Sequence, residues 1–523
     1  MTSLRDSCPA TASFLGSDEP WSAAAGDLDA AALLSALRKA ADRGNIPFFI
    51  PDLCALELAV SRVSRTAAVA PADAVGCVVN PALELCELAS SGCAALLDRR
   101  EAAAAPAPGR ERLLVWKRDG RVMVETAAPE DLAALKIVSE GIDPDAAARE
   151  AKARPELVRA VLGRALERGL VLAPPSRIRR DIPVSGAAQA AEVFTLQWHL
   201  TQSCDLSCRH CYDRSARPET PLARAVEVID DFRAFCRQRN VRGQISLSGG
   251  NPLLYPHFLD VYRRAADEGF DLAILGNPAP PERIAEIMAI ARPVYFQVSL
   301  EGLPEHNDAI RGPGHFERVM AFLDVLRDFG VQGQVMLTLT RDNMGQVLPL
   351  AELLEGRVWG LSFNRLSPVG RGTALALPDP AGFPIFLDDY CRAADRLSVL
   401  SFKDNMLNAQ LARTGRPTFG GCTGFGCGAA FNFMALLPDG EVHACRKFPS
   451  RIGDISRSGL GDIYDGPEAA RYRRRSEACR DCSIAAVCGG CLAVTSGLGL
   501  DIGRDRDPFC PGPIPAGPLV TAT

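Results

Sequence analysis

The sequence lacks the features of a membrane, secreted or nucleic-acid-binding protein. No segment of its 523 residues reaches the roughly 18 uninterrupted apolar residues that a membrane span needs. Residues 1–21 contain no charged segment followed by an apolar run, so no signal peptide is predicted. A net charge of −5 gives no global basic surface for nucleic acid or an anionic membrane. We therefore expect a cytoplasmic protein without a nucleic-acid or membrane partner.

Cysteine, in contrast, is abundant, with 18 copies. Disulfides are rare in a reducing compartment, so metal or redox chemistry is the better interpretation. Three cysteines lie between residues 204 and 211, and eight lie between residues 422 and 510. The remaining seven lack ligand spacing and are predicted to be small buried hydrophobic residues: Cys8, Cys54, Cys77, Cys86, Cys93, Cys236 and Cys391.

The first third of the chain divides into two predicted regions. Residues 1–105 are Ala-rich, with helical apolar spacing in residues 30–44 and 51–65. Residues 102–109 have the composition of a linker. The sequence of residues 110–175 predicts a hairpin around Asp119-Gly120, followed by three short helices and a brief strand. This order of elements is a winged-helix-like pattern.

From residue 194 strands alternate with amphipathic helices. The predicted strands are residues 194–201, 244–250, 271–278, 293–302, 332–340 and 360–368. Such alternation predicts an α/β fold with a parallel sheet, here a partial (β/α)6 TIM-type barrel over residues 194–400. In such barrels the active site lies at the C-terminal strand ends. Residues 401–515 are Gly- and Cys-rich, and we expect metal ligation to order them.

The first cysteine cluster directly follows the first of these strands, as Cys204-x3-Cys208-x2-Cys211. Three thiolates can bind a [4Fe–4S] cluster and leave one iron open. Zinc is the alternative, but it usually takes four ligands from paired Cys-x2-Cys knuckles. The spacing resembles the radical S-adenosylmethionine (SAM) superfamily, with His210 at the aromatic position. That resemblance implies that SAM binds the open iron and is cleaved reductively to a 5′-deoxyadenosyl radical.

The same resemblance predicts the SAM contacts. Residues 248–252 are similar to the Gly-Gly-Glu-Pro segment that holds the SAM amino group, with Asn in place of Glu. Residues 299–302 are similar to the Ser-(Leu/Ile)-Asp-Gly segment that contacts the ribose, followed by an arginine that can pair with the SAM carboxylate or form a surface ion pair. The predicted cofactor-binding residues are Ser248, Gly249, Gly250, Asn251, Ser299, Glu301, Arg311 and His210.

The second cysteine cluster resembles the SPASM extension of peptide- and protein-modifying radical SAM enzymes. Gly440-x4-Cys445 and Cys479-x2-Cys482-x5-Cys488-x2-Cys491 follow its pattern, with a last gap of two residues instead of three. Eight thiolates suffice for two clusters with four cysteine ligands each, which makes three [4Fe–4S] clusters in the chain. By resemblance one auxiliary cluster takes Cys422, Cys427, Cys445 and Cys491, and the other takes Cys479, Cys482, Cys488 and Cys510. Two structural zinc sites are the alternative.

The residue after Cys445 is informative because sulfatase-maturating members of this family carry a catalytic Asp there. Here Arg446 and Lys447 occupy this position and the next. The basic pair either binds an acidic group of the substrate or screens the negative charge of a cluster, and the sequence favours screening.

Residues 110–175 resemble the peptide-recognition element of maturases of ribosomally made peptides, which captures a leader by adding it to a sheet edge. DNA binding is less favoured because residues 156–168 mix Glu and Arg; a docking domain without a ligand is the other alternative. The sequences of residues 248–254 and 419–433, among others, are similar to those of the thio(seleno)oxazole-modification (selenobacteriocin) maturases. We expect a precursor peptide as substrate, a flavodoxin- or ferredoxin-type electron donor, and oxidation at Cys. The alternatives are carbon–carbon linkage in peptide-derived cofactor synthesis and, as a non-enzyme, a zinc-binding adaptor.

Overall fold

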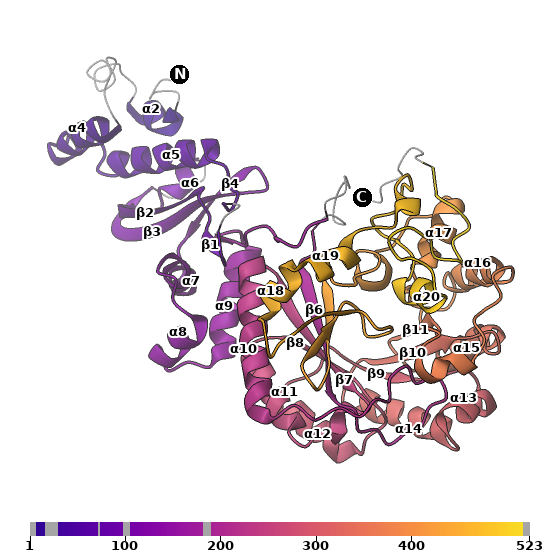
Figure 1. The fold of residues 1–523 in the computed structure, drawn as a ribbon. Coiled ribbons are helices and arrows are strands. Elements are labelled where there is room, and N and C mark those ends of the chain that lie inside the picture. Colours follow the sequence, from indigo (N-terminus) through magenta and orange to yellow (C-terminus); the bar gives the residue numbers. More distant parts are fainter. Residues whose placement is uncertain (1–6, 16–29, 72–73, 98–104, 181–189, 516–523) are drawn as a thin grey trace. The chain divides into compact units, whose positions relative to one another are not determined.

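The computed structural model describes residues 7–15, 30–71, 74–97, 105–180 and 190–515, which form two compact units, 1–175 and 176–523 (Figure 1). In these described ranges no helix has both the length and the apolar character to cross a membrane.

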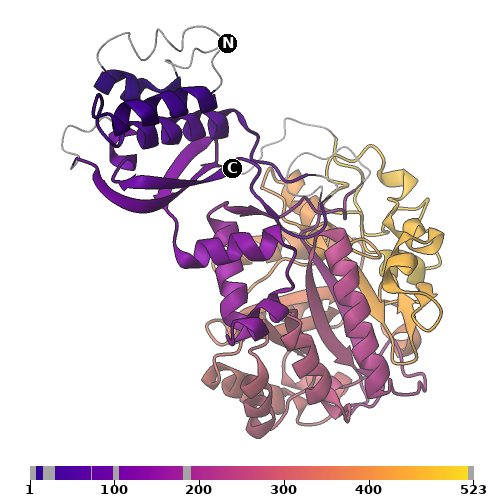
Figure 2. The ribbon, with the colours of Figure 1, turned by 90° about the vertical axis from the view of Figure 1, so that its left-hand side faces the viewer.

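The first unit is built on a three-stranded antiparallel sheet in the order β2-β3-β4, from Leu83–Ser91, Ala107–Arg118 and Arg121–Thr126. Side chains alternate along β3. Leu113 and Val115 pack with helices α4 (Ala30–Asp42) and α5 (Ile50–Arg65), which Figure 2 shows in indigo over the strands. Leu114 and Trp116 pack instead with residues of α7 (Pro129–Ser139) and α9 (Pro155–Glu167). The sheet is therefore covered on both faces.

The connection between β3 and β4 is the predicted hairpin. Asp119 and Gly120 both have positive φ values, of 49° and 78°, as a two-residue turn of this kind requires. Helices α7 (Pro129–Ser139), α8 (Pro144–Glu150) and α9 (Pro155–Glu167) follow, and β5 (Val171–Leu172) pairs with β1 (Val78–Val79). Short helices α2 (Pro9–Leu15) and α6 (Ala94–Leu97) complete the unit.

Three expectations for this unit need correction. Residues 83–91, placed in a helical region, form β2, because pairing with β3 outweighs the helix propensity of their Ala and Leu residues. The predicted linker overlaps β3 at residues 107–109, while residues 98–104 lie outside the described chain. Cys77 is exposed and Cys86 is half-buried, whereas the other five non-cluster cysteines are buried as predicted.

The second unit contains the expected parallel barrel strands. Strands β6 to β11 lie side by side in sequence order, and every described pair among them is parallel. They span Val193–Thr201, Arg242–Gly249, Asp271–Leu275, Tyr295–Ser299, Gly333–Leu339 and Gly360–Arg365. The intervening helices are α10 (Leu222–Arg239), α11 (Phe258–Asp267), α12 (Pro281–Ile290), α13 (Pro304–Arg311), α14 (His315–Asp328) and α15 (Val347–Leu354). The partial (β/α)6 barrel is thus confirmed.

The Cys-rich region joins this barrel through the sheet itself. Strand β12 (Phe433–Leu436) pairs in parallel with β6, and β13 (Glu441–His443) and β14 (Arg451–Asp454) extend the sheet antiparallel beyond it. Around them lie helices α16 (Phe383–Ala393), α17 (Met406–Arg413), α18 (Leu460–Asp465), α19 (Pro467–Arg473) and α20 (Leu492–Gly497), with short 3-10 turns at 252–254, 344–346, 370–374, 421–423 and 477–479.

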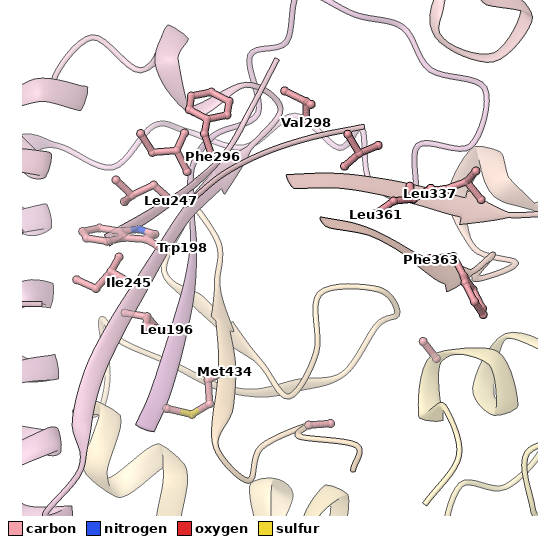
Figure 3. Packing of buried hydrophobic residues seen from close by; sticks show 14 of the residues in the cluster. Leu196, Trp198, Ile245, Leu247, Phe296, Val298, Leu337, Leu361, Phe363 and Met434 are labelled. Atoms are coloured by element: carbon pink, nitrogen blue, oxygen red, sulfur yellow. The ribbon is translucent and has the colours of Figure 1, made fainter. Parts of the chain in front are cut away.

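The barrel core lies between the outer face of the strands and the helices. Alternate apolar residues of each strand are buried there, such as Leu196 and Trp198 on β6 and Ile245 and Leu247 on β7 (Figure 3). The intervening residues face the other way, into the lumen.

Candidate active site

Many polar side chains line the lumen of the barrel. Along β6, Thr195, Gln197, His199 and Thr201 line a cavity of about 1340 Å³, and polar residues of β7, β9, β10 and β11 line it as well. This volume exceeds the range of roughly 300–1,000 Å³ typical of small-molecule sites. The cavity can therefore hold several bound groups, and cysteines of both predicted cluster regions are among the residues that line it. Sequence reasoning missed these lumen residues, although the polar residues at every second position of 194–201 were a usable signal.

The loop with the first three cysteines follows β6 and lines this cavity through Cys204, Cys208 and Cys211. Two glycines at the end of β7 let its backbone approach the backbone at the start of the cysteine loop. A Cβ on Gly249 would lie 2.3 Å from the carbonyl oxygen of Thr201, and one on Gly250 would lie 2.3 Å from that of Ser203. The backbone N–H of Gly250 donates to the Thr201 carbonyl at 2.9 Å. Both predicted glycines line the cavity, and both hold the start of the cysteine loop.

Asn251, the predicted contact of the SAM amino group, lies behind the cavity wall. Only 4% of it is exposed, and its Nδ2 donates to Oδ1 of Asp205 at 3.0 Å. Asn277 donates to the same Asp205 oxygen at 2.6 Å and lies 3.7 Å from Cys204 Sγ. Asn251 therefore fixes the cysteine loop through Asp205, and its contact with the SAM amino group stays a prediction.

Glu301, the predicted ribose contact, is likewise a buried partner of other site residues. Nε of Arg311 donates to Glu301 Oε1 at 2.8 Å, and Nε2 of His210 lies 2.8 Å from the same oxygen. The N–H of Thr338 donates to Oε2 at 2.8 Å. Glu301 is 1% exposed and does not line the cavity, whereas Ser299, Arg311 and His210 do. Glu301 thus orients Arg311 and His210, and its contact with the SAM ribose stays a prediction. The ion pair that was the alternative role of Arg311 is formed with Glu301, inside the protein and not at its surface.

The electrostatics of this group keep Glu301 ionised. Burial by itself raises the pKa of the carboxyl, but His210, Arg311 and the Thr338 N–H outweigh it and bring the pKa to about 2. Arg311 also lies 3.7 Å from Cys208 Sγ, where its charge lowers the pKa of a thiol that burial raises. A cation is therefore fixed beside the cysteine loop.

The eight C-terminal cysteines separate into two sets of four. The first set lines the barrel cavity, and the second lines a separate cavity enclosed by the Cys-rich region. The first set is Cys422, Cys427, Cys445 and Cys491, and the second is Cys479, Cys482, Cys488 and Cys510. This grouping is the crossed one that the sequence predicted, in which Cys491 leaves its neighbour Cys488.

The cysteine sets have the donors that iron–sulfur clusters take, because each set consists of thiolates alone. Three thiolates at the barrel mouth would hold one such cluster with an open iron, and its chemistry with SAM is that of a one-electron donor.

Two family models match this chain. Residues 198–354 match the radical SAM superfamily, and residues 427–483 match the SPASM iron-sulfur cluster-binding domain. The two segments contain the three-cysteine loop and four of the eight C-terminal cysteines.

Similar proteins agree with both matches. The mycofactocin maturase of Mycobacterium tuberculosis is 29% identical over 342 residues, which cover 60% of this chain and 82% of that protein. An AdoMet-dependent heme synthase of Methanosarcina barkeri is 27% identical and covers 60% of this chain and 95% of its own. The crystal structure of Streptococcus suis SuiB bound to S-adenosylmethionine shares the fold, with a TM-score of 0.51, 16% identity, and coverage of 77% of this chain and 96% of that one.

Together, the six-stranded parallel barrel, the cysteine loop at its mouth and the two family matches establish the chain as a radical SAM enzyme that carries a SPASM iron-sulfur domain.

Proposed function

We propose that this enzyme cleaves SAM reductively and oxidatively modifies a ribosomally made peptide. The observation that carries the proposal is the large cavity of the barrel lumen, which is lined by both the three-cysteine loop and four cysteines of the SPASM region. Its volume leaves room for a peptide segment beside SAM. The name of the mycofactocin maturase supports a maturation reaction, and the separate N-terminal unit supports a peptide partner.

In this proposal the chain's own residues hold and orient the reactants. Cys204, Cys208 and Cys211 hold the SAM-cleaving cluster, while Gly249 and Gly250 allow the loop to seat against β7. The eight SPASM cysteines hold two further clusters. Because all four irons of each would be ligated by the protein, these clusters would carry electrons and not bind substrate.

Iron content and SAM cleavage test the chemistry. Anaerobically purified protein should contain about twelve irons and twelve sulfides, as three four-iron clusters require. Changing Cys204, Cys208 and Cys211 together to Ala should remove one third of the iron and abolish formation of 5′-deoxyadenosine from SAM and dithionite. Wild-type protein that is fully loaded and reduced, yet cleaves no SAM even with its peptide, would contradict the proposal.

The modification itself is proposed to involve a Cys of the peptide, with a thioether-type cross-link as the product, in line with the resemblance to thio(seleno)oxazole-modification maturases. Such a link removes two hydrogens, and the auxiliary clusters could accept the surplus electron. Carbon–carbon linkage in peptide-derived cofactor synthesis is the competing product. Mass spectrometry separates them, because fragment ions place a thioether at Cys and a carbon–carbon link elsewhere.

We further propose that the N-terminal unit captures the leader of the precursor. Its sheet has β2 and β4 as outer strands, and a peptide can extend such a sheet by backbone hydrogen bonds. Capture there would raise the local concentration of the core peptide at the barrel. Such binding should depend weakly on salt, unlike phosphate binding.

A truncation at the boundary between the units tests leader capture. Residues 176–523 have their own hydrophobic core, so this fragment should retain clusters and slow uncoupled SAM cleavage. The fragment should turn over the full precursor more slowly than the intact enzyme does. A core peptide without its leader should be a poor substrate for both forms. Equal turnover of the precursor by both forms would refute capture. Turnover of a tetrapyrrole in place of any peptide would favour the chemistry in the heme synthase relative's name.

A further inference from the structure

Arg446 lines the cavity, and its guanidinium group is only partly hydrogen-bonded. It follows Cys445 just after β13, and its Nη1 donates to Oγ of Ser248 at 2.6 Å. Its guanidinium carbon lies 4.4 Å from the centre of the Tyr212 ring, which holds one face. Its Nε is buried and has no hydrogen-bond partner within the described chain. The side chain is therefore held in place with donor capacity unused.

Other buried guanidinium groups on this cavity are neutralised by carboxylates. Arg311 pairs with Glu301, Arg217 with Asp439 and Glu441, and Arg365 with Asp404 and Asp507. Across the described residues Arg446 has no carboxylate partner, and the group of opposite charge that acts on it is Cys211 of the three-cysteine loop. A buried positive charge is costly unless it is paired. The missing partner is expected to come from a bound molecule.

His199 completes this part of the lumen. It is 1% exposed, it stands beside Ser248 in the β6–β7 ladder, and neither ring nitrogen has a hydrogen-bond partner in the described structure. Burial, together with the charges of Arg446, His443 and Arg217, lowers the pKa of His199 well below its usual value. The ring is thus neutral near pH 7 and can donate one hydrogen bond without competing for the anion that Arg446 attracts.

We propose that Arg446, with Ser248 and His199, forms a carboxylate-binding subsite in the barrel lumen that takes an acidic side chain or the C-terminal carboxylate of the peptide substrate. A planar guanidinium with free donors matches a carboxylate in both geometry and charge. The inference rests on the proposed peptide substrate and replaces the cluster-screening interpretation of Arg446. It differs from screening because screening needs only the charge of Arg446, whereas the subsite also needs the hydrogen-bond donors of its guanidinium group.

The carboxylate of SAM has the same chemistry, so the experiment measures both ligands. The anaerobically reconstituted holoenzyme is titrated calorimetrically with N-acetylglutamate, with its neutral analogue N-acetylglutaminamide, in which both carboxylates are amides, and separately with SAM. Variants are Arg446→Gln and the charge-preserving Arg446→Lys. Lys447→Gln is the matched control, because Lys447 is the adjacent cation on the same cavity but its Nζ already donates to the Arg365 carbonyl at 3.0 Å.

The wild type and Lys447→Gln should bind N-acetylglutamate better than N-acetylglutaminamide. Arg446→Gln should weaken N-acetylglutamate binding at least about tenfold, the size expected for loss of a charged hydrogen-bonded pair, and Arg446→Lys should weaken it less. SAM affinity and the visible absorption of the clusters should be unchanged in all variants. These readouts need no turnover, so they remain informative even if the enzyme modifies no peptide.

Three results would overturn the subsite. Loss of SAM affinity in Arg446→Gln with N-acetylglutamate binding intact would assign the guanidinium to SAM. Equal shifts of cluster reduction potential in Arg446→Gln and Lys447→Gln, with probe binding unaffected, would restore charge screening. Absence of N-acetylglutamate binding to the wild type would exclude the subsite directly.

Discussion

The substitution Asp507→Asn should loosen the segment that carries the last cysteines. Asp507 Oδ1 accepts from Nη1 of Arg365 at 2.7 Å and from the Phe509 N–H at 3.0 Å. Its Oδ2 accepts from Nη2 of Arg365 at 2.7 Å and from the Cys491 N–H at 2.8 Å. The two side chains are at most 1% exposed. One carboxylate therefore links β11, Cys491 and the turn before Cys510.

Asparagine keeps the shape but removes the charge and turns one acceptor into a donor that faces other donors. Breaking a buried ion pair costs about 3–5 kcal/mol. Because Arg365 Nε also contacts Asp404 at 2.9 Å, the lower end, about 3 kcal/mol, is expected here. That free energy corresponds to local unfolding of the segment around Cys491 that is about a hundredfold more frequent.

Hydrogen exchange measured by mass spectrometry reports this opening locally, without requiring reversible unfolding of the whole chain. Amides of α20 should exchange about a hundredfold faster in Asp507→Asn than in the wild type. The matched control is Asp324→Asn, which breaks an exposed pair with Arg327 and should change protection in α14 by less than about 1 kcal/mol. Exchange of α20 within about threefold of the wild type would refute the role given to this ion pair.

Three further outcomes are expected. Gly250→Ala should lower occupancy of the SAM-cleaving cluster and leave the two auxiliary clusters intact, because the added Cβ would lie 2.3 Å from the Ser203 carbonyl oxygen. Iron analysis with electron paramagnetic resonance measures the occupancy, and full occupancy of all three clusters would contradict the prediction. The pKa of Glu301 is lowered from 4.5 to about 2, so its ionised carboxylate should contribute about 3 kcal/mol to the free energy of unfolding above pH 4.5, and this contribution is lost as the pH falls toward 2. Between about pH 6 and 3 the thermal midpoint of Glu301→Gln should therefore fall less than that of the wild type. Cys491→Ala and Cys488→Ala should remove different auxiliary cluster signals, and identical spectra would contradict the crossed grouping.

The barrel and the three-cysteine loop could be predicted because their signals are local, whereas the grouping of the eight C-terminal cysteines came from the resemblance to the SPASM extension. Strand–helix alternation fixes the order of β6 to β11, and cysteine spacing marks the loop after β6. Strand β2 was missed because its Ala and Leu residues favour a helix when the pairing with β3 is unknown. The Glu301–Arg311–His210 group could not be derived either, since a carboxylate at a strand end is equally compatible with a ligand contact and an internal ion pair. Burial decides between them, and burial is a tertiary property.

The parallel pairing of β12 with β6 has a consequence for how this enzyme can be divided. An open barrel leaves an edge strand with unpaired backbone groups, which is a site for aggregation. Here β12 covers the β6 edge, and β6 is the strand that leads into the three-cysteine loop. The SPASM region therefore cannot be removed as a separate domain. A catalytic core truncated before residue 427 would expose the edge of β6 and lose the strand pairing beside its own cluster loop.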